Sequence, residues 1–243
     1  MATELRTSEL SFTRDGDRIR GYGAWPTSPS AVPGLVLIPD VRGLYEHYCD
    51  VARRFAAEGF FTLAIDLYSR EGAPELPDMP SVFRWIRNLP DRRVLGDLSG
   101  AVDFVAARAE VRGHRVGITG FCMGGQYALL AACSQAQVGA CVSWYGMLRY
   151  AENDDLKPAS PLQLAPQLAC PYLGLFGEED AIIPLTDVEE LRSILTREQK
   201  TFEIVTYPKA GHAFFNDSRA DAYRPEASRD AWKRAVEFLR RQL

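Results

Sequence analysis

The strongest constraint on the fold of this chain is a repeated alternation of short apolar runs with segments of helical periodicity. Parallel strands need helical crossovers between them, and strands that are apolar throughout are buried on both faces. The alternation therefore predicts an α/β fold with a mostly parallel, twisted sheet and helices on both of its faces. The expected strands are 35–38, 60–65, 115–119, 140–144, 172–176 and 202–206, and the expected helices are 48–58, 94–109, 124–133, 186–196 and 227–239.

The length of the chain predicts one folding unit. A chain of 243 residues can bury a sizeable core, and single α/β domains of this size are common, so we expect one domain covering residues 1–243. Two short runs, 10–12 and 19–24, predict an antiparallel hairpin at the sheet edge. The Pro-rich stretch 72–80 is expected to be a surface loop that could form a rim or a lid.

The composition excludes several classes of function. Lys and Arg total 28 against 32 Asp and Glu, so the net charge of -4 leaves no excess of cations for a phosphate backbone. No stretch approaches the ~20 apolar residues that cross a bilayer, and the charged start of the chain is unlike a signal peptide. We expect a soluble, cytoplasmic protein without a nucleic-acid or membrane partner, and its oligomeric state remains unknown from the sequence.

The cysteines predict neither a metal cluster nor a disulfide framework. They form no CxxC pair and no spacing typical of a zinc site, and we expect no metal and no other cofactor. An odd number of cysteines fits reduced thiols in a cytosol better than paired ones. The five are Cys49, Cys122, Cys133, Cys141 and Cys170.

The most informative motif is Gly120-Phe121-Cys122-Met123-Gly124, which follows an expected strand and opens an expected helix. It has the G-x-S-x-G pattern of a nucleophile elbow, with cysteine in the serine position. The two glycines let the strand and the helix pass close to each other, so the Cys122 side chain is held above the sheet. The helix start offers free amides to a thiolate or an oxyanion, and we predict the Met123 amide as one oxyanion donor.

A second interpretation of this motif is a small buried cysteine in a phosphate-binding turn. The segment lacks the G-x-G-x-x-G spacing and the lysine of a P-loop, so the phosphate interpretation is weak. By itself the motif does not decide between a nucleophile and a core cysteine. That decision depends on whether an acid and a base lie at the right places further along the chain.

Both partners are present in the order that an α/β-hydrolase fold requires. The acid follows a strand beyond the nucleophile helix, and the histidine lies just before the last helix. Asp180 matches the G-x-x-D-x-x-x-P spacing of the acid loop, whereas the neighbouring Glu178 and Glu179 are expected to be solvated. His212 lies between the last expected strand and the last helix, and is the predicted base.

The other two histidines are weaker candidates. His114 precedes a strand in a charged turn, where a surface or capping role is expected. His47 stands near the start of a helix and could line the rim of a pocket, but no acid is expected to orient it. A structural role for His212 also remains open from the sequence.

The motifs together resemble the dienelactone hydrolase family, and the likeness extends over almost the whole chain. The resemblance implies an α/β-hydrolase fold and hydrolysis of an ester or of the lactone ring of a carboxymethylenebutenolide, without a cofactor. Cysteine at the elbow is the most discriminating feature. The matching segments are Gly120-Phe121-Cys122-Met123-Gly124-Gly125, Ile65-Asp66-Leu67-Tyr68, Trp144-Tyr145-Gly146 and Gly211-His212-Ala213-Phe214.

The resemblance also implies roles for the loop that follows the run 35–38. The family has a glutamate there that takes part in generating the thiolate, and this chain has Asp40, one methylene shorter. The Val41 amide would be the second oxyanion donor. From the residues alone Asp40 could simply form a turn and pair with Arg42, and Arg42 could contact a substrate carboxylate.

Substrate contacts are the least determined part of the site. The family places a carboxylate-binding arginine shortly after the histidine, whereas this chain has Asn216. Arg84 and Arg87, on the helix after the Pro-rich loop, could supply a charge or form a solvated face. Four aromatic side chains could be pocket walls or core: Tyr45, Trp85, Trp144 and Phe215.

The resulting hypothesis is a carboxylic ester hydrolase with a Cys122, His212 and Asp180 triad and a thioester intermediate. The imidazole takes the thiol proton or holds it as an ion pair, and the carboxylate fixes the tautomer of the ring. Acyl transfer or peptide cleavage on the same site is one alternative. A catalytically idle binding or sensor protein is another, because the fold does not guarantee hydrolysis.

Overall fold

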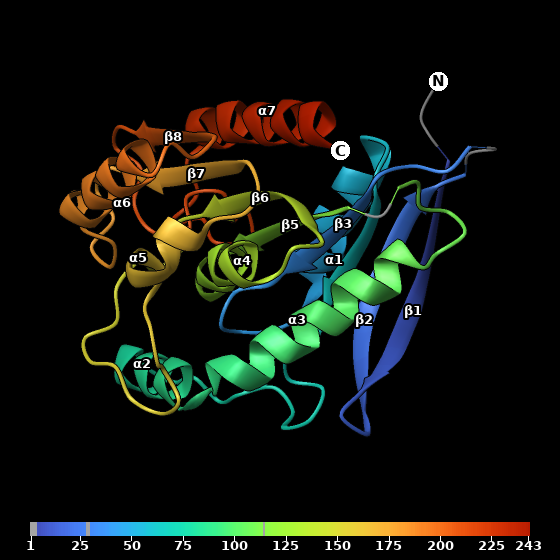
Figure 1. Ribbon diagram of the computed structural model, residues 1–243, viewed down its shortest axis with the longest axis horizontal. Helices are drawn as coiled ribbons and strands as arrows, with labels where there is room; N and C mark the ends of the chain where they lie inside the picture. The colour runs from blue at the N-terminus through green and yellow to red at the C-terminus, as the bar shows by residue number, and fades with distance from the viewer. Residues whose placement is uncertain (1–3, 28–29, 114) are drawn as a thin grey trace.

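In the computed structural model, residues 4–27, 30–113 and 115–243 are described, and their eight strands form one sheet. The strand order across this sheet is β1-β2-β4-β3-β5-β6-β7-β8 (Figure 1). The strands are β1 (Leu5–Arg14), β2 (Asp17–Pro26), β3 (Gly34–Ile38), β4 (Phe61–Ile65), β5 (Val116–Phe121), β6 (Val138–Trp144), β7 (Tyr172–Gly177) and β8 (Phe202–Tyr207).

The sheet is parallel except at one edge. Strands β4, β3, β5, β6, β7 and β8 pair in parallel, whereas β2 runs antiparallel to both β1 and β4. The strands from β3 to β7 are buried along their whole length, as expected for strands covered on both faces. The predicted α/β architecture, with an antiparallel hairpin at its edge, is therefore confirmed.

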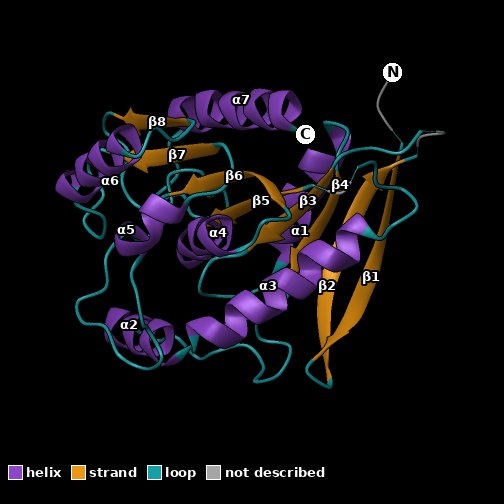
Figure 2. Cartoon of the chain, in the orientation of Figure 1, coloured by secondary structure: helices purple, strands orange, loops and turns teal. Residues whose placement is uncertain are grey.

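Helices cover both faces of the sheet (Figure 2). Phe55 of α1 packs against Trp232 of α7 with ring centroids 4.4 Å apart, so these two helices share a layer. In the view of Figure 2, α3 and α4 lie in front of the sheet and α1 lies behind it. The helices are α1 (Glu46–Ala57), α2 (Met79–Asn88), α3 (Asp91–Ala106), α4 (Met123–Ser134), α5 (Pro161–Leu164), α6 (Leu185–Arg197) and α7 (Pro225–Gln242), with a 3₁₀ turn at Ala165–Gln167.

The structure differs from the sequence prediction mainly at element ends. The hairpin strands are ten residues each, which is longer than predicted. The prediction was too short because β1 is a half-exposed edge strand, and its polar residues interrupt the apolar pattern. The stretch 72–80 is not all loop, since Asp78 caps α2 by accepting from the Ser81 amide at 2.8 Å. The short helix α5 was not predicted. His114 lies outside the described residues.

Candidate active site

The three predicted catalytic side chains lie after the ends of three strands of the sheet. Cys122 directly follows β5, Asp180 follows β7, and His212 follows β8. The carboxyl ends of parallel neighbours lie along one edge of a sheet, which is where open α/β folds place their sites. Glu178 and Glu179 are exposed, as the sequence predicted, whereas Asp180 is buried.

The turn at Cys122 is held in a strained conformation. Cys122 has φ 56° and ψ −119° between the last residue of β5 and the first residue of α4. Few side chains adopt such a backbone, and strain of this kind is characteristic of functional turns. The turn is possible because a Cβ on Gly120 would lie 2.0 Å from the Gly124 carbonyl oxygen, and one on Gly124 would lie 2.2 Å from that of Ile38. Both positions therefore require glycine.

Replacing Gly120 by alanine should distort this turn. The added methyl group meets backbone, which cannot rotate away, so we expect the free energy of unfolding to fall by at least about 2 kcal/mol. The matched control is Gly96→Ala in α3, where the nearest atoms to an added Cβ are 3.9 Å away. Urea unfolding measures both variants, and equal midpoints for the two would contradict the packing argument.

Asp180 and His212 form a hydrogen-bonded pair. The Nδ1 atom of His212 lies 2.9 Å from Oδ2 of Asp180, where the ring N–H donates to the carboxylate. The other oxygen, Oδ1, accepts from the Ile182 and Ile183 amides at 2.8 and 3.1 Å. Because the two amides fix the carboxylate, the carboxylate in turn fixes the orientation and tautomer of the imidazole.

The charge of Cys122 acts on His212. Burial lowers the pKa of the imidazole, but the negative charge of Cys122 and the hydrogen bond with Asp180 outweigh burial and raise the pKa to about 10. Nε2 of His212 is buried and makes no hydrogen bond of normal geometry within the described part of the chain. The raised pKa therefore favours the imidazolium form of His212 at neutral pH.

This coupling predicts a dependence of stability on pH. The pKa of His212 rises from 6.5 to about 10 on folding, so its contribution is complete below about pH 6.5 and is lost as the pH rises through about 10. We expect the free energy of unfolding of the wild type to fall more between pH 7 and pH 10 than that of Cys122→Ala, which lacks the thiolate. Urea titrations at both pH values test this, and equal losses would contradict it.

Tyr68 contacts both residues whose amides are the predicted oxyanion donors. Its hydroxyl donates to the Val41 carbonyl at 2.9 Å and lies 3.7 Å from Sδ of Met123. Met123 is the first residue of α4, so its amide belongs to the unpaired first turn of that helix. The close contact of Gly124 with Ile38 also brings the loop that contains Val41 against the start of α4.

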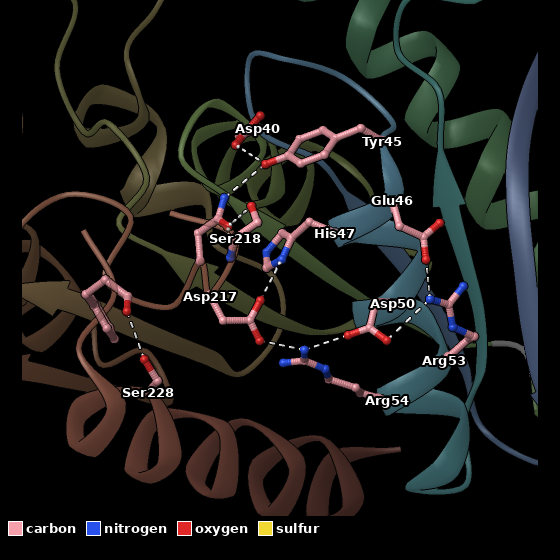
Figure 3. Close-up of polar contacts among 12 residues, drawn as sticks. Asp40, Tyr45, Glu46, His47, Asp50, Arg53, Arg54, Asp217, Ser218 and Ser228 are labelled. Atoms are coloured by element: carbon pink, nitrogen blue, oxygen red, sulfur yellow. Dashed lines mark hydrogen bonds and ion pairs between the residues drawn. The ribbon is translucent and has the colours of Figure 1, made fainter. Parts of the chain in front are cut away.

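Asp40 is connected to the histidine loop through Tyr45 (Figure 3). The Tyr45 hydroxyl donates to Asp40 Oδ2 at 3.4 Å and accepts from Asn216 Nδ2 at 2.9 Å. Asp40 also accepts from the Arg42 amide at 2.8 Å, so its contact with Arg42 is through the backbone, as in the predicted turn. Asn216, which replaces the arginine of the family pattern, thus fixes the loop after His212.

The expectation that no acid orients His47 is wrong. Nδ1 of His47 lies 3.1 Å from Oδ1 of Asp217, and Oδ2 of Asp217 accepts from Arg54 at 2.6 Å (Figure 3). Burial lowers the pKa of His47 despite Asp217, so the ring tends to be neutral. The sequence hid this pair because Asp217 lies 170 positions away, in the loop after His212. The His47–Asp217 pair therefore connects α1 to the loop after His212.

The remaining candidates divide into core and surface. Trp144 and Phe215 are buried and pack together with centroids 4.5 Å apart, so they belong to the core rather than to a pocket wall near the triad. Trp85 packs edge-on to Tyr68 at 5.4 Å. Arg42 and Arg84 are exposed, and the Arg84 guanidinium donates to the Ser81 hydroxyl at 3.2 Å.

Tyr145 is a residue of the site to which the sequence assigned no role. It follows β6, has φ 41°, and presents its ring edge-on to His212 with centroids 5.3 Å apart. Burial, Asp40 and Cys122 together raise the pKa of its hydroxyl well above 10, so the hydroxyl stays protonated. The available signals were its position at the carboxyl end of a strand and its place in the family-like segment Trp144-Tyr145-Gly146.

Nothing in the described residues suggests a metal site. No group of three or more His, Cys, Asp or Glu side chains in residues 4–27, 30–113 and 115–243 is arranged to hold an ion. In the same residues, no helix combines the length and the apolar character needed to span a bilayer.

A strained cysteine turn after β5, followed along the chain by an acid after β7 and a histidine after β8, defines an α/β-hydrolase. Residues 19–243 match the model of the dienelactone hydrolase family. A Bradyrhizobium protein provisionally named 2-oxo-3-(5-oxofuran-2-ylidene)propanoate lactonase is 36% identical and covers 100% of this chain and 98% of its own. A Salmonella typhimurium protein provisionally named carboxymethylenebutenolidase is 38% identical over 94% of this chain and 85% of its own.

A solved structure agrees with these relatives. The crystal structure of a provisionally named dienelactone hydrolase from Klebsiella pneumoniae subsp. pneumoniae MGH 78578 is 37% identical, with a TM-score of 0.92, over 98% of this chain and 99% of that chain. The chain therefore belongs to the dienelactone hydrolase family and is a carboxylic ester hydrolase.

Proposed function

We propose that this protein hydrolyses a small ester or lactone through Cys122, His212 and Asp180. The sulfur of Cys122 adds to the carbonyl carbon, and the carbonyl electrons move to the oxygen. The imidazolium of His212 then protonates the alcohol oxygen as its bond to carbon breaks, which leaves a thioester on Cys122. His212 next takes a proton from water and the hydroxide adds to the thioester carbon. The carbon–sulfur bond then breaks, which releases the acid and restores the Cys122 thiolate beside the protonated His212.

The amides of Met123 and Val41 are the proposed oxyanion donors. Hydrogen-bond donors that are fixed before the reaction stabilise a developing charge without reorganisation. Tyr68 holds Val41 close to Met123, as its contacts to both residues indicate. Asp40 is an auxiliary residue in this proposal, and its carboxylate is oriented by Tyr45 and the Arg42 amide.

The observation that carries the proposal is the buried Asp180–His212 pair beside the elbow cysteine. A histidine whose Nδ1 bonds a fixed carboxylate, and whose pKa is raised by a neighbouring thiolate, has the environment of a base for a nucleophile. The lactone named for the Bradyrhizobium relative makes a lactone a reasonable substrate class here. The five cysteines are unpaired, which fits the cytoplasmic location that we also propose.

Acyl transfer, peptide cleavage and an idle binding role remain the alternatives. A product assay separates the first two from hydrolysis, because they yield a transferred acyl group or a cleaved amide. Selective alkylation of Cys122 distinguishes hydrolysis from the third alternative, an idle binding role. Burial raises the pKa of Cys49, and raises that of Cys133 and Cys170 to about 12, so these thiols are poor nucleophiles at neutral pH.

The test combines alkylation with turnover of p-nitrophenyl acetate. One equivalent of iodoacetamide at pH 7 should label Cys122 and abolish the release of nitrophenolate in parallel. Peptide mapping then reports how the label is distributed over the five cysteines. Full activity after complete labelling of Cys122, or an inert Cys122 in an active enzyme, would refute the proposed nucleophile.

A further inference from the structure

A cavity of about 410 Å³ opens beside the loop that contains Asp180. Its walls come from α2, from the segment after β6 and from the segment after Asp180. In Figure 1 the segment that follows β6, in yellow, runs alongside α2. Most of the wall is apolar or aromatic, and the residues that carry the argument are Phe83, Ile86, Met147, Tyr150, Ala181 and Ile182.

The cavity wall is bonded directly to the catalytic elements. The Ile182 amide donates to Asp180 Oδ1 at 2.8 Å, so this wall residue also orients the acid. Gln126, one turn after Cys122 on α4, donates to the Tyr150 hydroxyl at 2.9 Å. A group that occupies the cavity would therefore contact residues that are bonded to Asp180 and to the helix that begins after Cys122.

Exposed apolar side chains gather around the same cavity. Within residues 4–27, 30–113 and 115–243, only four large apolar residues are exposed. Phe83 itself lines the cavity. Each of the other three lies within four positions, along the chain, of a residue that lines it. Isolated exposed apolar residues need no explanation, but a group of them around one opening indicates a binding surface. The four are Met79, Phe83, Leu156 and Leu185.

The cations of the cavity are already paired with carboxylates. Arg87 donates to Asp154 at 2.8 Å and Lys157 to Asp91 at 2.6 Å. The third cation, Arg149, pairs with both Asp187 and Glu190. At least four carboxylates thus face three cations, so a carboxylate on a substrate would find no uncompensated positive charge in this cavity.

We propose, on the basis of the proposed esterase function, that this cavity binds an uncharged apolar part of the substrate, such as an aryl group or a medium-length alkyl chain. The preferred substrates are then neutral esters or lactones rather than esters that carry a free carboxylate. Burial of apolar surface favours the first class, and desolvation of an unpaired carboxylate disfavours the second.

Two matched ester pairs test the proposal. The acyl pair is p-nitrophenyl hexanoate and mono-p-nitrophenyl adipate, which share a six-carbon chain and differ by a terminal carboxylate. The alcohol pair is phenyl acetate and 4-carboxyphenyl acetate. In at least one pair we expect kcat/KM of the wild type to be about tenfold or more higher for the neutral ester.

Variants at Phe83 connect that preference to the cavity. Phe83→Ser should reduce the ratio severalfold, Phe83→Leu should largely retain it, and Phe83→Arg should shift it toward the charged ester. Circular dichroism and thermal unfolding check that each variant is folded. Because Phe83 is exposed, none of the three is expected to unfold the protein.

The outcomes separate this inference from the proposed function. A wild type that prefers the charged ester in both pairs, or a ratio that does not change in Phe83→Ser and Phe83→Arg, overturns the inference while Cys122-dependent turnover still stands. Turnover that is equal in the wild type and in Cys122→Ala overturns the proposed function itself, and the inference with it.

Discussion

Replacing Cys122 by alanine is expected to lower kcat/KM for an aryl ester by on the order of 10⁴-fold or more. The strained elbow presents this sulfur at the start of α4, and the other proposed catalytic groups act on it or through it. Without the sulfur no thioester forms, and only the oxyanion donors and the binding of the substrate remain. Initial rates with p-nitrophenyl acetate, corrected for spontaneous hydrolysis, measure the loss.

The control for this variant is Cys49→Ala. Cys49 is also partly exposed, but it lies on α1 in a groove with Tyr22 and Leu44, away from the elbow. Its removal should change kcat/KM by less than about twofold, because surface substitutions away from a site have small effects. A comparable loss in the two variants would show that the effect of Cys122→Ala does not come from the nucleophile.

Breaking the buried ion pair of Lys157 is expected to lower the free energy of unfolding by about 3–5 kcal/mol. Lys157 is 1% exposed, and its ammonium donates to Asp91 at 2.6 Å and to the Tyr127 hydroxyl at 2.8 Å. Asp91 also accepts from the hydroxyls of Tyr127 and Tyr150 at 2.9 and 2.8 Å. Lys157→Met leaves this carboxylate buried without its counter-charge.

A second substitution shows whether the unpaired charge causes the loss. Adding Asp91→Asn to Lys157→Met removes the buried charge while an amide still bonds the two tyrosines, so much of the stability should return. Arg197→Met is the matched control, because its pair with Glu198 is exposed and contributes about 0–1 kcal/mol. Urea unfolding measures all three, and a double variant less stable than Lys157→Met would contradict the explanation.

The sequence predicted the central part of the fold well because the signal there is strong. Strands β3 to β7 are buried on both faces, and their continuous apolar runs give no competing pattern. The edge strand β1 carries a run of exposed polar residues at 6–9 and was predicted only in part. Helix α2 was expected after the Pro-rich loop but without bounds, and Ile86 is its one buried residue.

The site was predictable where chemistry and chain order coincide, and not where contacts are long-range. The positions of Asp180 and His212 followed from the end of each strand, and the structure bonds these two side chains directly. The link from Tyr45 to Asn216 joins residues 171 positions apart, and no local pattern predicts it. The same limitation hid the contact between His47 and Asp217.

The most direct test of the account is to trap the acyl group on the enzyme. p-Nitrophenyl trimethylacetate should acylate Cys122 and deacylate slowly, because its crowded carbonyl hinders attack by water. We predict a burst of one nitrophenolate per active chain and an equal amount of trimethylacetyl thioester, which peptide mapping places on Cys122. A stoichiometric burst with no adduct on Cys122, or with the adduct on another residue, would contradict the proposed mechanism.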